Sequence, residues 1–261
     1  MLKSLKFVRF GLFAAMMALP SIGAAETSAA DKSDVSVVLV HGAFSDGSAW
    51  HKVIPILQEA GVSVSAAQLP LASLESDATV VRRLLDLQKG PVVLVGHSYG
   101  GSVITEAGAH DKVDTLVYVA GFALDAGQSL TEMTKGHPPS PWKAAAIPDA
   151  AGFVRLSADG IATYFAPDLP AEEAALIAAT QGPVHYKIND QAPTVAAWSM
   201  RPTFYVLTEN DQIIPPKLQG FFAKRMGASV TEVQASHVAM LSQPDVVAEV
   251  ILNAVAATSK D

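Results

Sequence analysis

The feature of this sequence that most restricts its fold is a set of short strands that are apolar along most of their length. Val35–Val40 (VSVVLV), Val92–Val95 (VVLV) and Val113–Val119 (VDTLVYV) are rich in β-branched residues, and stretches with helical spacing of apolar residues separate them. Such strands must be covered on both faces, which is typical of a parallel sheet between two layers of helices. Right-handed crossovers then predict a doubly wound α/β sandwich with a mostly parallel six-stranded sheet.

Further strands and helices continue the alternation along the chain. The remaining strands are expected at Val62–Ala67, Thr203–Leu207 and Ser229–Val233. Helices are expected at residues 50–60, around residues 80–85, and at residues 99–110 and 216–226. A last helix is expected to start at Ser242, because Asp245 three residues later completes the pattern of a capping box. One α/β domain is therefore expected over residues 35–257.

Residues 125–201 interrupt this alternation. The stretch is rich in proline, and a short helical sequence (AEEAALIAAT) follows Pro170. It is too long for a plain connection and too short for an independent domain, so we interpret it as an inserted helical cap over the carboxyl edge of the sheet. Its aromatic residues are interpreted as the packing of the cap rather than as ligand contacts; they are Trp142, Phe153, Tyr164, Phe165, Tyr186 and Trp198.

The N-terminus has the layout of a secretory signal peptide. Lys3, Lys6 and Arg9 precede an uncharged, mostly apolar stretch at residues 10–22, and small residues end at Ala25. We predict a signal peptide over residues 1–25, cleavage after Ala25, and a polar linker over residues 26–34. The expected location is periplasmic or secreted. After cleavage no stable membrane association is expected, since no later uncharged run is long enough to span a bilayer.

Composition excludes several classes of function. The chain has 18 basic and 25 acidic residues, a net charge of −7, which argues against nucleic acid as a partner. It contains no cysteine, so disulfides, thiolate metal sites and a cysteine nucleophile are excluded. Neither a GxGxxG pattern nor an HExxH pattern occurs. We therefore expect no cofactor and no metal.

The sharpest chemical signal is a GxSxG motif at residues 96–100, with Ser98 at its centre. It directly follows an apolar strand and opens a helix, which is the placement of a nucleophile elbow. The strained turn would present the Ser98 hydroxyl at the helix N-terminus, where amide groups favour developing negative charge. The alternatives are a glycine-rich packing turn or a phosphate-binding loop, and the missing nucleotide motifs weaken the second.

A serine nucleophile needs a base, and His237 is the candidate among the seven histidines. It follows the last strand, and in a doubly wound sheet that loop opens on the same edge as the elbow. His41 also ends a strand, but its expected role is to hold a loop by hydrogen bonding. His97 lies inside the elbow, with its side chain expected to point away from the hydroxyl of Ser98.

A third residue should orient the imidazole of His237. Asp211, in the loop after the strand at residues 203–207, is preferred, because serine, acid and histidine then occur in the chain order of this fold. Glu209 in the same loop and Asp125 after an earlier strand remain in reserve. The alternative for Asp211 is a plain turn residue, because aspartate is common in turns.

Stabilising an oxyanion requires two backbone donors near the serine. The N–H of Tyr99, directly after the nucleophile, is one candidate. The second should come from the loop after the first strand, where Gly42 allows a close approach of the backbone. Ala43 N–H is preferred there, with Phe44 N–H in reserve.

Four motifs in order along the chain carry a family resemblance. They are HGAFSDGSAW (41–50), GHSYGG (96–101), ENDQIIPP (209–216) and SHVAMLSQPD (236–245). Over about residues 35–257 the chain resembles the α/β-hydrolases, in particular the small esterases related to plant hydroxynitrile lyases and methyl-salicylate esterases. The resemblance implies Ser98 as nucleophile, His237 as base and Asp211 as acid, with Ala43 and Tyr99 as the oxyanion donors.

Two departures from that family pattern limit what the resemblance implies. Hydroxynitrile lyases carry a lysine directly after the histidine, where this chain has Val238, so cyanohydrin chemistry is not expected. The two strands that often precede the first strand of larger hydrolases have no counterpart in residues 26–34, which favours a minimal six-stranded sheet.

The expected function is hydrolysis of a small carboxylic ester by a serine esterase through an acyl-enzyme on Ser98. Two alternatives stay open at this stage, because fold and triad are shared among them. One is a cofactor-free perhydrolase or lyase on the same scaffold. The other is a slow-turnover ligand-binding or regulatory protein. The expected partner is a small-molecule ester, and the sequence leaves open whether the chain forms a homo-oligomer.

Overall fold

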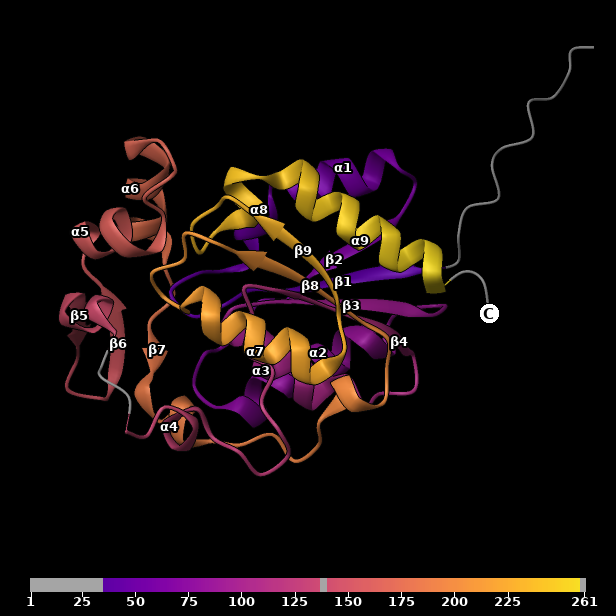
Figure 1. Cartoon of the computed structure of the whole chain (residues 1–261), viewed down its shortest axis with the longest axis horizontal. Coiled ribbons are helices and arrows are strands. Elements are labelled where there is room, and N and C mark those ends of the chain that lie inside the picture. The colour runs from indigo at the N-terminus through magenta and orange to yellow at the C-terminus, as the bar shows by residue number, and fades with distance from the viewer. Residues whose placement is uncertain (1–34, 137–139, 259–261) are drawn as a thin grey trace, which may run out of the picture. The chain divides into compact units, whose positions relative to one another are not determined.

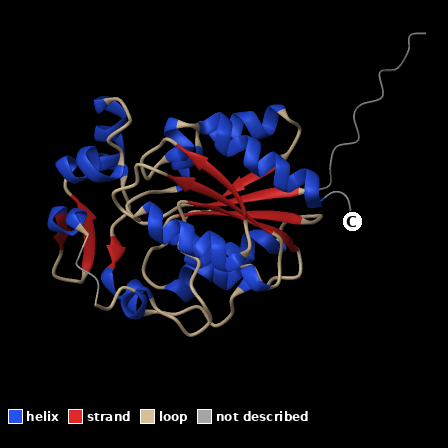
Figure 2. Ribbon diagram, in the orientation of Figure 1, coloured by secondary structure: helices blue, strands red, loops and turns tan. Residues whose placement is uncertain are grey.

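A central parallel sheet organises the computed structural model, which describes residues 35–136 and 140–258. The predicted signal peptide (1–25) and linker (26–34) lie outside the described residues. Within the described part, six strands lie in the order β2-β1-β3-β4-β8-β9, and every neighbouring pair is parallel. The predicted doubly wound fold is confirmed, and Figure 2 shows the twisted sheet between its helices.

The strands of this sheet follow the apolar runs of the sequence closely. They are β1 (Ser36–Val40), β2 (Ser63–Ala66), β3 (Val92–His97), β4 (Val113–Val119), β8 (Thr203–Thr208) and β9 (Ser229–Val233). Every residue of β1 and β3 is buried. The edge strands β2 and β9 are only partly buried, because helices cover the centre of the sheet more completely than its edges.

Helices cover both faces of the sheet (Figure 1). The helices α1 (Val53–Glu59) and α9 (Pro244–Thr258) pack on one face, and α2 (Leu74–Asp86), α3 (Tyr99–Ala107) and α7 (Pro216–Met226) lie on the other. The start of α2 was not predicted: Ser73 caps it and forms a reciprocal pair with Ser76. No helix among the described residues is long and apolar enough to cross a membrane.

The predicted start of the last helix was wrong. Ser242 is the final residue of a separate short helix, α8 (Ala239–Ser242), and α9 begins two residues later at Pro244. The hydroxyl of Ser242 is buried, and the described residues offer it no hydrogen-bond partner. The pattern of serine followed by Asp245 was therefore accidental, because Pro244 suits the first turn of a helix and sets the start there.

The cap over the sheet is mixed rather than purely helical, so that prediction was wrong in part. It contains α4 (Leu130–Met133), α5 (Ala158–Gly160) and the expected α6 (Ala171–Thr180). It also contains an antiparallel sheet of β5 (Ala146–Pro148), β6 (Phe153–Leu156) and β7 (Val184–His185). These strands are too short to show a period of two in the sequence. Figure 1 shows the cap beyond the arrowheads of β8 and β9.

Arg225 of α7 ties both ends of the cap insertion to the core. Its guanidinium donates to the Asp125 carboxylate at 2.7 Å and to the carbonyl of Ala123, where the insertion begins. It also lies 5.2 Å from the ring centre of Trp198, close to where the insertion ends. Trp198 in turn donates its indole N–H to Leu124 O. The root of the cap is therefore held by a cation–π contact and by charged hydrogen bonds.

Candidate active site

Ser98 occupies a strained turn between β3 and α3. Its φ of +52° and ψ of −122° are unfavourable for a residue with a side chain, and such strain is typical of functional sites. A Cβ on Gly96 would lie 2.5 Å from the carbonyl oxygen of Gly100, so a glycine is needed where the chain turns. The turn places the Ser98 side chain at the N-terminus of α3, as the nucleophile-elbow interpretation expects.

The structure brings Ser98, His237 and Asp211 together although they lie far apart in the sequence. The Ser98 hydroxyl is 2.8 Å from His237 Nε2, and His237 Nδ1 is 2.7 Å from Asp211 Oδ2. A carboxylate only accepts hydrogen bonds, so Nδ1 carries the proton of the neutral ring and Nε2 accepts from the serine. The ring of His237 is fully buried.

Asp211 is buried and surrounded by donors. Its Oδ1 accepts the backbone N–H groups of Ile213 (2.7 Å) and Ile214 (2.9 Å). Its Oδ2 accepts from the hydroxyl of Thr208 at 3.0 Å and from the amide of Gln219 at 2.9 Å, besides His237. These contacts compensate for the burial of a charged carboxylate and fix its direction toward the imidazole.

Glu209 and Asp125, the two other candidates for the acid, make their hydrogen bonds away from His237. The carboxylate of Glu209 is exposed and accepts from the side chain of Gln234. The carboxylate of Asp125 is bound by Arg225 at the root of the cap. Neither is hydrogen-bonded to His237 among the described contacts, so Asp211 alone of the three orients the imidazole.

Two other histidines lie close to the site. His41 behaves as expected: its Nε2 accepts the backbone N–H of Leu69 at 3.0 Å, which holds the loop after β2. His97 is closer to the site than expected. Its Nε2 donates to the carbonyl oxygen of His237 at 2.8 Å, and the centres of the two rings are 4.7 Å apart. Burial lowers the pKa of His97 well below its usual value, so the ring is neutral. Its role is to hold the backbone of His237 by a hydrogen bond.

The loop after β1 passes beside the nucleophile. A Cβ on Gly42 would lie 2.7 Å from the Cβ of Ser98 and 3.0 Å from the ring of His97. Ala43 and Phe44 follow at the wall of the same cavity as Ser98 and Tyr99. Phe44 has a φ of +58°, so the loop turns sharply at this point. Ala43 and Tyr99, the expected sources of the two backbone donors, therefore line the same cavity as Ser98.

Gly42→Ala is expected to lower kcat about 100- to 1,000-fold, the cost of losing one oxyanion donor. The added methyl group can be accommodated only if the loop or the elbow moves, and either movement displaces the Ala43 N–H from Ser98. Gly220→Ala is the matched control, because its Cβ would lie at an ordinary 3.8 Å from Leu207. Kinetics of both variants on one ester test this; similar rates in the two would contradict it.

A buried carboxylate lies behind the elbow. Asp77 of α2 accepts the hydroxyl of Tyr99 at 2.7 Å and the backbone N–H of Leu71 at 2.9 Å. Burial raises the pKa of Asp77 to about 6, and the hydrogen bonds from Tyr99, Leu71 and Ser76 offset only part of that effect. The carbonyl of Leu71 accepts the N–H of His185 at 2.8 Å, so this carboxylate links the residue after the nucleophile to the cap.

Asp77 should make the free energy of unfolding fall as the pH rises from 4 to 7. Its folded pKa of about 6 lies above the value of 3.8 for an unperturbed aspartate, so the folded state binds more protons in this range. The expected loss is about 2 kcal/mol relative to Asp77→Asn, which cannot titrate. Urea unfolding of both proteins at pH 4, 5, 6 and 7 measures the difference. Parallel curves for the two would contradict the assignment.

A cavity of about 330 Å³ opens at Ser98 under the cap. This volume is sufficient for a small organic ligand. Most of its lining is apolar or aromatic: Phe44, Leu74, Tyr99, Phe122, Leu124, Leu130, Trp142, Val154, Phe165, Val184, Tyr186, Ile188 and Ile213. Three of the six cap aromatics assigned to packing, Trp142, Phe165 and Tyr186, also line this cavity. Phe165 is at the same time buried in the hydrophobic core, as that interpretation expects.

No group of three histidine, aspartate or glutamate side chains in residues 35–136 and 140–258 could hold a metal ion.

Sequence reasoning missed several residues of the site. Gln219 and Thr208 hold Asp211, His97 holds the backbone of His237, and Asp77 lies behind Tyr99. Two of these residues could have been noticed as polar residues on the apolar face of a helix. Asp77 and Gln219 are both fully buried within amphipathic helices, where a polar side chain needs a partner.

A doubly wound parallel sheet with a serine at a strand–helix elbow, and an acid and a histidine on later loops of one edge, defines the class of α/β hydrolases. The chain belongs to the Alpha/beta hydrolase family, whose pattern it matches over residues 37–250.

Individual relatives are distant but span almost the same length. The Pyrethroid hydrolase of Sphingobium wenxiniae is 26% identical over 245 residues, covering 82% of this chain and 85% of that protein. Methylesterase 1 of Arabidopsis thaliana is 23% identical over 259 residues, covering 85% and 96%. The crystal structure of polyneuridine aldehyde esterase superposes with a TM-score of 0.73 at 22% identity, covering 84% and 98%, which shows a shared fold.

Proposed function

We propose that this protein is a serine hydrolase that cleaves small carboxylic esters. The observation that carries the proposal is the unbroken hydrogen-bond chain from Ser98 through His237 to Asp211, which begins at the apolar cavity. Relatives named as a pyrethroid hydrolase and a methylesterase support ester hydrolysis as the reaction class.

In the proposed mechanism, the Ser98 oxygen attacks the ester carbonyl while His237 Nε2 accepts its proton. The carbonyl oxygen becomes an oxyanion that accepts hydrogen bonds from the N–H groups of Ala43 and Tyr99. His237 then donates the proton to the leaving alcohol, and an acyl group remains on Ser98. Water attacks this ester with His237 again as the base, releasing the acid and restoring the serine. Asp211 holds the tautomer and stabilises the imidazolium in both halves.

The cavity favours an ester with uncharged, apolar groups on at least one side of the scissile bond. Its lining offers large aromatic surfaces, and few charged side chains reach it. Val238, which replaces the lysine of the hydroxynitrile lyases, is buried and apolar, so no observation favours cyanohydrin cleavage. A small-molecule ester therefore remains the proposed partner, and export by the N-terminal segment remains part of the proposal.

Turnover of p-nitrophenyl esters of increasing chain length tests the function. A burst of p-nitrophenol equal to the enzyme concentration, followed by steady turnover, is the expected result for an acyl-enzyme mechanism. Tight binding of the esters with negligible turnover would instead identify a ligand-binding protein. Turnover that appears only when peroxide is supplied would identify a perhydrolase.

A further inference from the structure

The loop that carries His237 is held by the cap as well as by the sheet. Ser236, directly before His237, donates its backbone N–H to Asp168 Oδ2 at 2.7 Å and its hydroxyl to Asp168 Oδ1. Asp168 belongs to the cap insertion, 68 positions earlier in the chain, between the π-helical turn Ile161–Phe165 and α6. One carboxylate of the cap therefore accepts two hydrogen bonds from the residue before the histidine.

A second contact joins the same two segments. The ring of Phe165 meets the imidazole of His237 edge to face, with 5.2 Å between ring centres and an angle of 65°. The carbonyl of Phe165 also lies 3.4 Å from the Ser236 hydroxyl. The π-helical turn that ends at Phe165 is a rare conformation that occurs often at functional sites. Cap residues 165–168 thus contact both Ser236 and His237.

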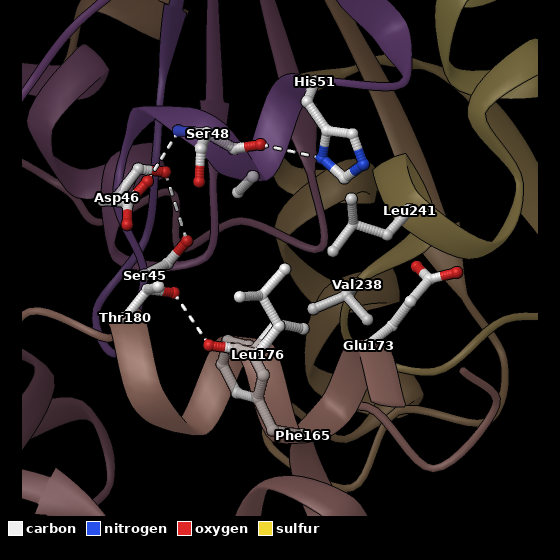
Figure 3. Close-up of a pocket in the computed structure, with 12 residues that line it drawn as sticks. Ser45, Asp46, Ser48, His51, Phe165, Glu173, Leu176, Thr180, Val238 and Leu241 are labelled. Carbon is white, nitrogen blue, oxygen red and sulfur yellow. Dashed lines mark hydrogen bonds between the residues drawn. The ribbon is translucent and has the colours of Figure 1, made fainter. Parts of the chain in front are cut away.

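Apolar packing between the cap and this loop is incomplete. A hollow of about 90 Å³ lies beside the contact, between α6 on the cap and α8 after the histidine. Figure 3 shows the side chains of Phe165, Leu176 and Val238 around it. Because no side chain fills this hollow, the residues that line it lose some of their van der Waals contacts across the boundary. The hydrogen bonds of Asp168 therefore supply directional contacts at this boundary, beside the ring contact of Phe165.

We propose that Asp168 is a positioning residue for the base: it holds the histidine loop through Ser236 and so couples the placement of the cap to that of His237. The inference rests on the proposed function. His237 Nε2 must stay within hydrogen-bonding distance of Ser98, where it now lies at 2.8 Å. Asp211 fixes the ring through Nδ1 and His97 holds the backbone carbonyl of His237. Asp168, which belongs to the cap, holds the preceding residue.

A purely structural role for Asp168 makes a different prediction. If the carboxylate only fastened the cap, its loss would change the shape of the cavity and therefore raise KM, with kcat nearly unchanged. A role in placing the base affects the chemical step, so kcat falls while KM stays near its wild-type value. Both constants are measured with the same p-nitrophenyl ester, so that kcat and KM are compared for one reaction.

The test compares Asp168→Ala, Asp168→Asn, Ser236→Ala and a control, Asp159→Ala, which removes an exposed carboxylate from α5 of the same cap. Asp168→Ala is expected to lower kcat about 10- to 100-fold with KM within about twofold, the scale of a base displaced by about 1 Å. Asp168→Asn should recover most of the rate, because an amide can accept from the Ser236 N–H and donate to its hydroxyl. Ser236→Ala, which removes one of the two bonds, should give a smaller loss, and Asp159→Ala none.

A kcat within twofold of wild type in Asp168→Ala, or a raised KM with unchanged kcat, would overturn the proposal. Asp168→Asn as slow as Asp168→Ala would overturn it too, since charge rather than hydrogen bonding would then matter. If Asp168→Ala does not fold, Ser236→Ala and Asp168→Asn decide the question.

The rate at which a fluorophosphonate labels Ser98 gives a readout that needs no ester substrate but does need the base. A wild-type protein that is labelled yet hydrolyses no ester would refute the proposed function, and the ratio of labelling rates would still decide the role of Asp168. A wild-type protein that is not labelled at all would refute both.

Discussion

Ser98→Ala is expected to lower kcat for ester hydrolysis by about 10⁴-fold or more, the scale of the loss when a triad nucleophile is removed. No other hydroxyl is hydrogen-bonded to His237 Nε2 among the described residues, so none can replace it. The fold should survive, because the serine hydroxyl contributes one hydrogen bond within the site and alanine introduces no larger side chain. Steady-state kinetics and thermal unfolding of the purified variant measure both effects.

Ser63→Ala is a matched control for the loss of a serine hydroxyl, because Ser63 is exposed on the edge strand β2 and far from the elbow in the sheet. It should retain full activity. A Ser98→Ala protein that kept a tenth of the wild-type rate with an unchanged unfolding temperature would disprove the assignment of Ser98 as nucleophile.

Asp211→Asn is expected to cost about 10³- to 10⁴-fold in kcat. An amide in place of the carboxylate allows His237 to adopt the wrong tautomer, in which Nε2 carries the proton and cannot accept one from Ser98. The amide NH₂ would also face donors, since Ile213, Ile214, Thr208 and Gln219 all donate to this carboxylate. Some loss of stability is therefore expected, so kcat is measured well below the unfolding temperature of the variant.

Glu209→Gln is the companion variant, and it should keep nearly the full rate. Glu209 is in the same loop as Asp211, but its carboxylate is exposed and bonded to Gln234. A severe loss in Glu209→Gln together with an active Asp211→Asn would reverse the assignment of the acid.

The fold and the three central residues could be predicted because their signals are local or topological. Consecutive apolar residues made the strands of the sheet recognisable, and a serine between two glycines after a strand marked Ser98 as a turn residue. His237 and Asp211 followed from topology, since parallel strands bring the loops after them to one edge. Asp211 was the preferred acid, and the structure places its carboxylate 2.7 Å from His237 Nδ1.

The errors arose where short segments depend on distant ones. In the described part of the chain, the three strands of the cap pair with each other and are too short for a periodic signal. Ser242 matched a capping pattern that the neighbouring Pro244 overrode.

By itself the sequence determined the parallel sheet, the elbow at Ser98 and the order of acid and histidine, because these depend on side-chain periodicity, glycine sterics and connection handedness. Tertiary structure alone decided which residues hold them. Gln219 donates to Asp211, and His97 donates to the backbone of His237. Asp77 accepts from Tyr99, and Asp168 of the cap accepts from Ser236. Each of these contacts joins segments that are separate in the chain, and a polar residue shows its partner only after packing has excluded water from both.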